Sequence, residues 1–274
     1  MRTNQEIAFW SIDHPWHSAE QVEQDLLLSQ AICVIANDPL LGDELALRGG
    51  TAFHKLLLSQ QYRYSEDLDY VRMSAGGIGE VMKRLTWLGR ELGFRVNTTM
   101  AVYPKVIWRF VCASGVAGKI KIEINTQERF AALPLIRRGF NVVCDGQDIV
   151  ADVLTYQTEE IAATKIRALY QRSKGRDLFD LWLVLTQMDV DVQAIVEAFS
   201  FYRPEGVTAD KLVENLSKKL DDMRFLHDVD VLIRANSVRY DPIEAAHLVS
   251  DLLLRPLGGT SPLSSEKRTP GLGA

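Results

Sequence analysis

Two acidic residues, Asp67 and Asp69, stand two positions apart in a segment, residues 62–71, whose pattern predicts a β-strand. Side chains at positions i and i+2 of a strand project to the same side, so both carboxylates face one way. Paired carboxylates are hard oxygen ligands that suit Mg²⁺, an ion that also binds substrate phosphates. Taken alone, such a pair is more often just two surface acids on a half-exposed strand.

A third acid, Glu123, belongs to another expected strand, residues 119–125. Ile120, Ile122 and Ile124 alternate with polar residues there, so Glu123 faces away from the apolar side. A third carboxylate near the first two would let two metal ions share one site and clamp the oxygens of an in-line phosphoryl displacement. Taken alone, Glu123 on an exposed strand face is more often just a solvated residue.

A glycine turn, Gly49-Gly50-Thr51, follows a short apolar stretch and precedes an expected helix. Backbone N–H groups of glycines can approach a phosphate closely, and the N-terminus of a helix favours negative charge. The hydroxyl of Thr51 could add a hydrogen bond. The simpler explanation is a strand-to-helix turn that needs glycine. The chain has no GxxxxGK[ST] motif, which argues against a P-loop NTPase.

A pair of helices around residue 175 adds charged groups. Lys165 and Arg172 are seven positions apart and therefore share one helical face. Lys165 could hold a triphosphate as a point charge, and Asp177 could orient Lys165 or an arginine. The alternative is a salt-bridged helical hairpin in which Phe179 and Trp182 are core residues.

The surrounding pattern divides the chain into an α/β half and a helical half. We predict an α/β domain over residues 1–150, a helical domain over residues 151–257 and a disordered tail over residues 258–274. The fold class is α+β with a mixed sheet. Strands are expected at residues 45–47, 62–71, 95–100, 106–113 and 119–125. Helices are expected at residues 18–40, from residue 53, and at 80–92, 159–171, 176–186, 192–202, 209–225 and 241–254, with Thr158 as an N-cap.

Composition sets broad limits on function. The net charge of −5 does not point directly to nucleic acid, although a local basic patch can act within an acidic chain. Such patches are expected from Arg167, Arg172, Lys174 and Arg176, and from Lys119 and Lys121. Three distant cysteines, of which Cys33 and Cys112 are expected in the core, and the lack of an apolar signal segment or membrane span favour a cytoplasmic protein. His14 and His17 have no cysteine partners and are expected to be structural or exposed rather than zinc ligands.

Two sequence blocks together resemble the AbiEii/AbiGii family of nucleotidyltransferase toxins, within the polymerase-β-like superfamily. The first block is RGGTAFHK, residues 48–55, followed by RYSEDLD, residues 63–69. The second is KIRALYQR, residues 165–172, followed by RDLFDL, residues 176–181. The resemblance covers residues 20–185. Phe53 stands where the family usually has leucine, a conservative change.

The resemblance implies a role for each matching residue. Gly49, Gly50, Thr51 and Ser65 would bind the phosphates of a nucleoside triphosphate (NTP), with Lys165 also contacting the nucleotide. Asp67 and Asp69 would bind Mg²⁺, with Glu123 as a less diagnostic third acid, and Asp177 would complete the catalytic set. The expected function is that of a toxin of a toxin–antitoxin or abortive-infection system, active in phage defence or growth arrest. It would transfer a nucleotide from an NTP to the 3′ end of tRNA, with an antitoxin encoded nearby and no membrane association.

Two alternatives stay open from the sequence. The same chemistry could modify a protein or a small molecule, or the chain could be a nucleotide-binding module without catalysis. The intact set of Asp67, Asp69, Lys165 and Asp177 argues against the second alternative.

Overall fold

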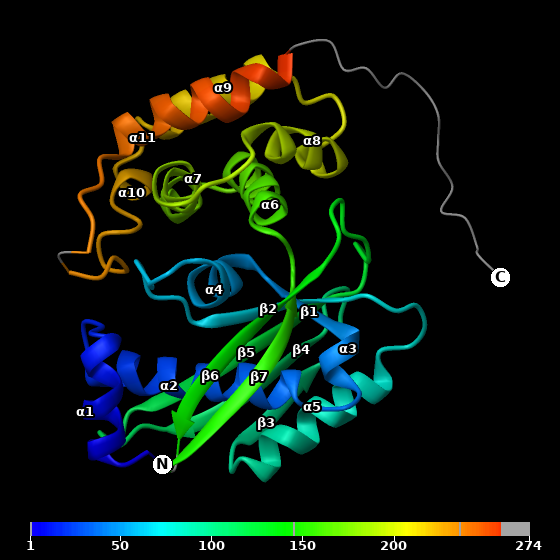
Figure 1. The fold of residues 1–274 in the computed structure, drawn as a ribbon, viewed down its shortest axis with the longest axis vertical. Coiled ribbons are helices and arrows are strands. Elements are labelled where there is room, and N and C mark those ends of the chain that lie inside the picture. The colour runs from blue at the N-terminus through cyan, green and yellow to red at the C-terminus, as the bar shows by residue number, and fades with distance from the viewer. Residues whose placement is uncertain (1, 145, 236, 259–274) are drawn as a thin grey trace.

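The computed structural model of the chain describes residues 2–144, 146–235 and 237–258 (Figure 1). Over these residues a mixed sheet has seven strands in the order β3-β4-β5-β2-β1-β7-β6. The strands are β1 (Leu45–Arg48), β2 (Asp67–Arg72), β3 (Arg95–Thr99), β4 (Lys105–Val111), β5 (Ala117–Asn125), β6 (Ile136–Cys144) and β7 (Gln147–Thr155). Pairs β2–β5 and β1–β7 are parallel, and the other neighbours are antiparallel. The predicted mixed sheet is confirmed.

Helices lie on both faces of the sheet and continue beyond it. They are α1 (Asn4–Asp13), α2 (Ala19–Ala36), α3 (Leu41–Glu44), α4 (Gly49–Ala52), η1 (Phe53–Leu57), α5 (Gly79–Glu91), α6 (Thr158–Gln171), α7 (Gly175–Gln187), α8 (Val192–Tyr202), α9 (Ala209–Lys219), α10 (Met223–Leu226), α11 (Pro242–Val249), η2 (Ser250–Leu254) and η3 (Arg255–Gly258). None of the helices within the described residues is long and apolar enough to cross a membrane.

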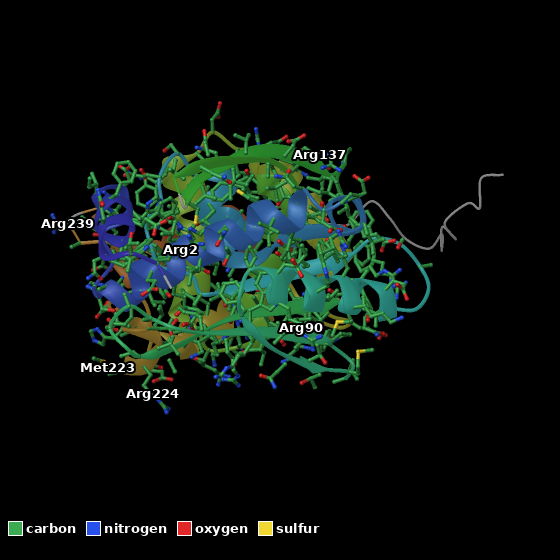
Figure 2. All side chains as sticks on the ribbon, turned by 90° about the horizontal axis from the view of Figure 1, so that it is seen from below. Arg2, Arg90, Arg137, Met223, Arg224 and Arg239 are labelled. Carbon is green, nitrogen blue, oxygen red and sulfur yellow. The ribbon has the colours of Figure 1, made fainter. Side chains whose placement is uncertain are left out.

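One face of the sheet is apolar and covered by α2 and α5, which lie side by side (Figure 2). Ile120, Ile122 and Ile124 of β5 are fully buried in this layer, as their alternation predicts. Cys33 of α2 and the β4 residue Trp108 belong to the same buried region, the former in agreement with its expected core position. Because this face is filled, the polar residues of β2 and β5 turn to the opposite face, toward α4, α6 and α7.

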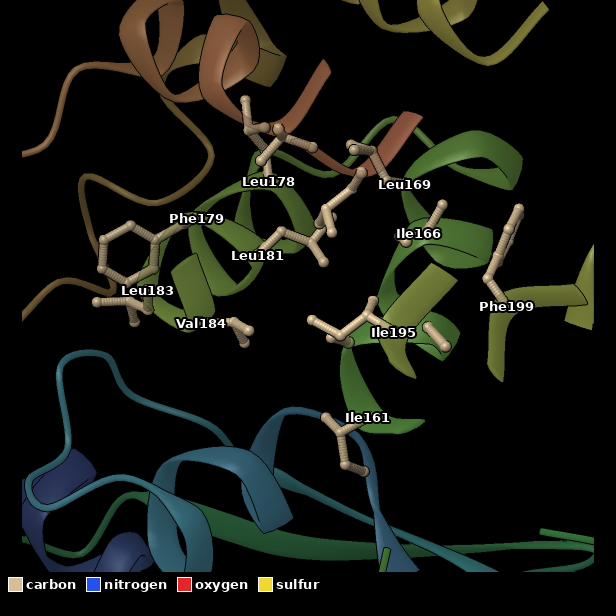
Figure 3. Packing of buried hydrophobic residues seen from close by; sticks show 14 of the residues in the cluster. Ile161, Ile166, Leu169, Leu178, Phe179, Leu181, Leu183, Val184, Ile195 and Phe199 are labelled. Carbon is tan, nitrogen blue, oxygen red and sulfur yellow. The ribbon is translucent and has the colours of Figure 1, made fainter. Parts of the chain in front are cut away.

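A second hydrophobic core holds the helical part together (Figure 3). Ile166 of α6, Leu178 and Leu181 of α7, and Phe199 of α8 are among its fully buried members. Ala46, Phe53 and Val71, which come from the sheet and the helix after the glycine turn, belong to the same core. Burial of apolar area is therefore shared across the two parts and fixes α6 and α7 above β1 and β2.

The structure corrects several expected elements. The strand predicted over residues 62–71 begins only at Asp67, because the preceding segment pairs with the C-terminal loop: Tyr64 N–H donates to Leu232 O, and Arg234 N–H to Tyr62 O, both at 2.8 Å. The helix expected over residues 209–225 is interrupted after Lys219. The helix after the glycine turn already begins at Gly49.

Other differences are elements that the sequence analysis did not predict and an N-cap that lies one residue earlier than expected. The β6–β7 hairpin was not predicted, nor were α1 and α3. Thr158 is the first residue of α6 instead of its N-cap, and Gln157 takes the cap position. Strand β7 ends at Thr155, and the division of the chain near residue 150 stays a prediction. Of the predicted tail, residues 259–274 lie outside the described residues.

Close packing at the start of α7 gives a first prediction. A Cβ on Gly175 would overlap the carbonyl oxygen of Phe225, which is backbone and cannot easily move. We therefore expect Gly175→Ala to lower the free energy of unfolding by about 1–3 kcal/mol, measured by urea denaturation. Gly139→Ala is the matched control, since a Cβ there meets no atom within 4 Å. Equal denaturation midpoints for both variants would contradict the close contact.

Candidate active site

The register of β1, β2 and β5 brings three acids together on the polar face of the sheet. Asp69 lies opposite Arg48 of β1 on one side and Glu123 of β5 on the other. Asp67 lies two residues before Asp69 on the same strand and opposite Lys121. Neighbouring strands in register place side chains of one face about 5 Å apart. The predicted gathering of Asp67, Asp69 and Glu123 on one face is therefore present.

Two lysines pair with this acid cluster. Lys121 Nζ lies 2.8 Å from Asp67 Oδ2 and 2.8 Å from Glu123 Oε2, while Lys105 Nζ lies 2.6 Å from Glu123 Oε1. Burial alone would raise the pKa of Glu123, but hydrogen bonds from Lys105 and Lys121 bring it below its usual value. Glu123 is thus held ionised, and the ammonium group of Lys121 lies between it and Asp67.

Asp69 differs from its two neighbours because no hydrogen bond or ion pair reaches its carboxylate from the residues that the structure describes. Burial raises the pKa of Asp69, and the negative charges of Asp67 and Glu123 raise it further. Gly49 lies directly against this carboxylate: a Cβ there would stand 2.8 Å from Asp69 Oδ2, and the φ angle of Gly49 is 78°. Both facts require glycine at this position.

Thr51 and Ser65 link the glycine turn to β2. Their hydroxyl oxygens are 2.8 Å apart, and the Thr51 hydroxyl also donates to the carbonyl oxygen of Asp67. Thr51 is buried, so its hydroxyl holds the start of β2 beside the turn. Their contact with substrate phosphates stays a prediction.

Above the acids, α6 and α7 supply a paired set of charges. Lys165 Nζ lies 3.1 Å from Asp177 Oδ1, and Arg172 donates two hydrogen bonds to Asp177, at 2.7 and 2.9 Å. Burial would raise the pKa of Asp177, but Lys165 and Arg172 bring it below its usual value. The predicted orientation of Lys165 by Asp177 is thus present as a contact. The side chain of Arg172 remains about half exposed, which leaves it accessible to a ligand.

Asp180 is the most heavily paired group of the site. Arg63 donates to both of its oxygens at 2.7 Å, Lys165 Nζ lies 2.7 Å from Oδ2, and His54 Nε2 lies 3.0 Å from Oδ1. All four side chains are almost fully buried. Burial opposes ionisation of Asp180, yet Arg63 and Lys165 hold its pKa well below the usual value. The arginine also lies against Gly50, where any Cβ would overlap its guanidinium.

Several of these groups line one cavity of about 170 Å³ between the sheet and the helices. Acids on its lower side face cationic side chains on its upper side. Its lining includes Gly50, Ser65, Asp67, Asp69, Arg63, Lys165, Arg172 and Arg176. A second hollow of about 140 Å³ shares Asp69 and is lined also by Arg48, Tyr103, Glu123 and Asn125. Asp69 therefore stands between two hollows, one rich in cations and one beside the third acid.

Some site residues were assigned no role from the sequence alone. Arg63, His54 and Asp180 lie inside the two resembling blocks, but their mutual pairing was not predicted. The available signal was the position of Asp180 among the apolar residues of α7, since a buried charge needs partners. No feature of the sequence around Tyr103 indicated that this residue lines the site. Of the predicted basic cluster, Arg167 turns away and pairs with Glu128.

The acids have the right chemistry for Mg²⁺, which prefers carboxylate oxygens. No three His, Cys, Asp or Glu side chains in the described parts of the chain stand in an arrangement that could hold a metal ion. In the present arrangement Lys121 pairs with both Asp67 and Glu123. Asp67, Asp69 and Glu123 fit a divalent cation by charge and donor type once Lys121 gives way.

A sheet that gathers carboxylates beneath a cationic helical wall, joined by a glycine turn, is the framework of a nucleotidyltransferase, and the chain is an enzyme of this class. The family profile described as "Nucleotidyl transferase AbiEii toxin, Type IV TA system" matches residues 32–222. The chain belongs to this family of toxins from toxin–antitoxin systems.

A comparison with solved structures supports the fold through MenT4. MenT4, the nucleotidyltransferase toxin Rv2826c of Mycobacterium tuberculosis H37Rv, superposes with a TM-score of 0.64 at 16% identity, covering 96% of this chain and 91% of MenT4. An antigenic nucleotidyltransferase-like protein of Paracoccidioides brasiliensis has a TM-score of 0.42 at 16% identity, over 77% of this chain and 95% of that one. None of the curated proteins matches the sequence of this chain.

The buried His54 gives a prediction of pH dependence. Burial, followed by the charge of Arg63, lowers the pKa of His54 from its usual 6.5 to about 4. As the pH falls through 6.5, the unfolded chain binds a proton at this residue and the folded chain does not. Stability should therefore decrease from pH 6.5 to about pH 4, by up to about 3 kcal/mol from this residue.

Urea denaturation of wild type and His54→Gln across this pH range is the measurement. Glutamine can still donate to Asp180 but cannot be protonated, so the variant should show a shallower loss of stability. His14 also has a pKa lowered by burial, and its contribution is common to both proteins. Identical pH slopes would show that His54 is not buried in its neutral form.

Proposed function

We propose that this protein is a Mg²⁺-dependent toxin that transfers a nucleotide from an NTP to the 3′ end of tRNA, and so blocks translation and growth. The observation that carries the proposal is the arrangement around Asp69. Its carboxylate, which has no pairing partner in the described part of the chain, lies between a cationic cavity suited to a triphosphate and a second hollow beside Glu123 that an acceptor can enter. The alternative acceptors, a protein or a small molecule, share the same chemistry.

Each side of the cavity has a separate part in the reaction. Lys165 and Arg172, oriented by Asp177, neutralise the charge of the triphosphate. Two Mg²⁺ ions, held by Asp67 and Asp69 with Glu123 as the third acid, would supply charge neutralisation at the reacting phosphate. An acceptor hydroxyl attacks the α-phosphorus in line, the bond to the β-phosphate oxygen breaks, and pyrophosphate leaves while the hydroxyl releases its proton.

The cellular role follows from the family. A type IV toxin implies an antitoxin partner, and we expect one to be encoded nearby. Activity in the cytoplasm, in abortive infection or phage defence, belongs to the same proposal. Arg172 and Arg176 line the cavity and are the residues that we expect to contact RNA phosphates.

Transfer of label from α-³²P-NTPs to purified total tRNA, with Mg²⁺, tests the proposal. Asp69→Asn should reduce transfer by about 10³-fold or more, because it removes a charge required at the reacting phosphate. Asp152→Asn, an exposed aspartate of β7, is the matched control and should retain full activity. Label on a protein or a small molecule instead of tRNA would show that the proposed acceptor is wrong. Absence of label with every NTP and acceptor would contradict the proposed reaction itself.

The contacts of Lys121 predict competition between this lysine and Mg²⁺. Lys121→Met removes the cation that lies between Asp67 and Glu123. We expect the Mg²⁺ concentration for half-maximal transfer to fall by about tenfold, which corresponds to ~1.4 kcal/mol. Lys119→Met, a neighbour on the same strand, should leave this concentration unchanged. A higher Mg²⁺ requirement in Lys121→Met would show that the lysine assists the metal site instead.

A further inference from the structure

The turn between β3 and β4 carries a group of exposed apolar side chains next to the active site. Met100, Val102 and Tyr103 are 64%, 66% and 50% exposed. Single exposed apolar residues are common on protein surfaces, but these three lie close together on one turn and form a small patch. Tyr103 also lines the hollow of about 140 Å³ that contains Asp69 and Glu123. The patch therefore borders the part of the site that an acceptor can enter.

The strands around this turn fix the position of Tyr103 relative to the acids. Lys105, two residues further along, lies opposite Glu123 in the β4–β5 pairing and contacts it through its ammonium group. Pro104 is buried, and its carbonyl oxygen accepts a hydrogen bond from the N–H of Ile124 at 2.9 Å. A residue before proline favours extended backbone, in which side chains two positions apart share a face. Tyr103 thus turns to the face that holds Glu123, in agreement with its place in the lining of the hollow.

The ring of Tyr103 is accessible and has no partner within the described part of the chain. No aromatic ring of these residues stacks on it, and no hydrogen bond from them holds its hydroxyl. The other two aromatic residues that line the two hollows, Tyr64 and Tyr70, are buried. Tyr103 is therefore the aromatic side chain of the described lining that a bound molecule can reach.

The order of groups across the site indicates which substrate this ring meets. In an in-line transfer, the attacking hydroxyl and the leaving pyrophosphate stand on opposite sides of the phosphorus. Lys165 and Arg172, which suit the triphosphate, line the cavity on one side of Asp69. Glu123 and Tyr103 line the other hollow together with Asp69. This order puts the attacking hydroxyl in the second hollow, beside the ring of Tyr103.

We propose that Tyr103 stacks on the terminal base of the acceptor, and that the acceptor is the 3′ end of a single-stranded RNA segment. The base at such an end has a free face that can lie against an aromatic side chain. Every base has a flat face, so stacking selects a nucleotide without selecting the identity of its base. The hydroxyl of a serine or threonine side chain is attached to no such ring. The inference rests on the proposed function and names the class of its acceptor.

Fluorescence of 2-aminopurine, which is quenched when this base stacks, tests the proposal with Mg²⁺ and without NTP. The probe is a short single-stranded RNA with 2-aminopurine as its 3′-terminal base, titrated with the full chain. Wild type should quench the probe, and Tyr103→Phe, which keeps the ring, should bind and quench equally. Tyr103→Leu should bind about tenfold more weakly and lose the quenching.

Trp87→Leu is the matched control. Trp87 is an exposed aromatic residue of α5, which covers the opposite face of the sheet, so this variant should bind and quench as wild type does. The same RNA with 2-aminopurine at its 5′ end should show little quenching. Equal quenching by wild type and Tyr103→Leu, equal quenching at both ends of the RNA, or no quenching at all would overturn the proposal.

Transfer kinetics separate this inference from the proposed function. Tyr103→Leu should raise KM for RNA about tenfold and leave kcat and KM for the NTP unchanged, because stacking stabilises the ground state and the transition state equally. A rise in KM for the NTP instead would show that the ring binds the nucleotide donor, and the inference would be wrong. If the 3′-terminal base stacks on Tyr103 but no NTP supports transfer, the stacking stands and only the proposed function fails.

Discussion

The buried carboxylate of Asp180 is the group on which the arrangement of the site depends. An isolated charge at such depth would be very unfavourable, and it is tolerated because Arg63, Lys165 and His54 all pair with it. Two of these partners precede β2 in the sequence and one lies on α6. One carboxylate therefore joins α7 to α6 and to the segment that follows the glycine turn. Removing it would leave buried cations unpaired in both parts of the chain.

This pairing explains why neither part can form the site alone. The register of β2 and β5 places Asp67, Asp69 and Glu123, but the lysine that it adds, Lys121, is already paired with two of these acids. Further cations come from α6, from the loop before α7 and, with Arg63, from the segment before β2, and those of Lys165, Arg172 and Arg63 are oriented by Asp177 and Asp180. Gly50 completes the connection, because only a residue without Cβ leaves room for the guanidinium of Arg63 beside the turn. The hydrophobic core that includes Ala46 and Phe53 as well as the helices keeps these surfaces at a fixed separation.

Periodicity in the sequence was sufficient to predict which way the acids face. It was insufficient to predict the contacts between charged residues that are far apart in the chain. The isoleucines of β5 identify the buried face, so the side on which Glu123 lies follows directly from strand alternation. Asp180 and Arg63 meet across 117 positions in the chain, and no local pattern specifies such a contact. The β6–β7 hairpin was missed for a related reason: β6 is an edge strand with largely exposed residues, and its alternation of apolar and polar positions is weak. Its place in the sheet depends on β7 pairing in parallel with β1.

The charges of the cavity are balanced within each surface, yet incompletely. On the sheet, Lys121 and Lys105 offset Asp67 and Glu123, while none of the described residues pairs with Asp69, whose pKa is raised by burial and by the neighbouring acids. On the helices, Asp177 and Asp180 offset Lys165 and also Arg63 of the segment before β2, while Arg172 stays half exposed. A ligand that carries both signs of charge can satisfy both surfaces at once: cations beside Asp69 and phosphates beside Arg172. A metal–triphosphate complex has this composition, whereas a free anion or a free cation would complement only one wall. The electrostatics of the cavity therefore favour the substrate together with its metal over either component alone.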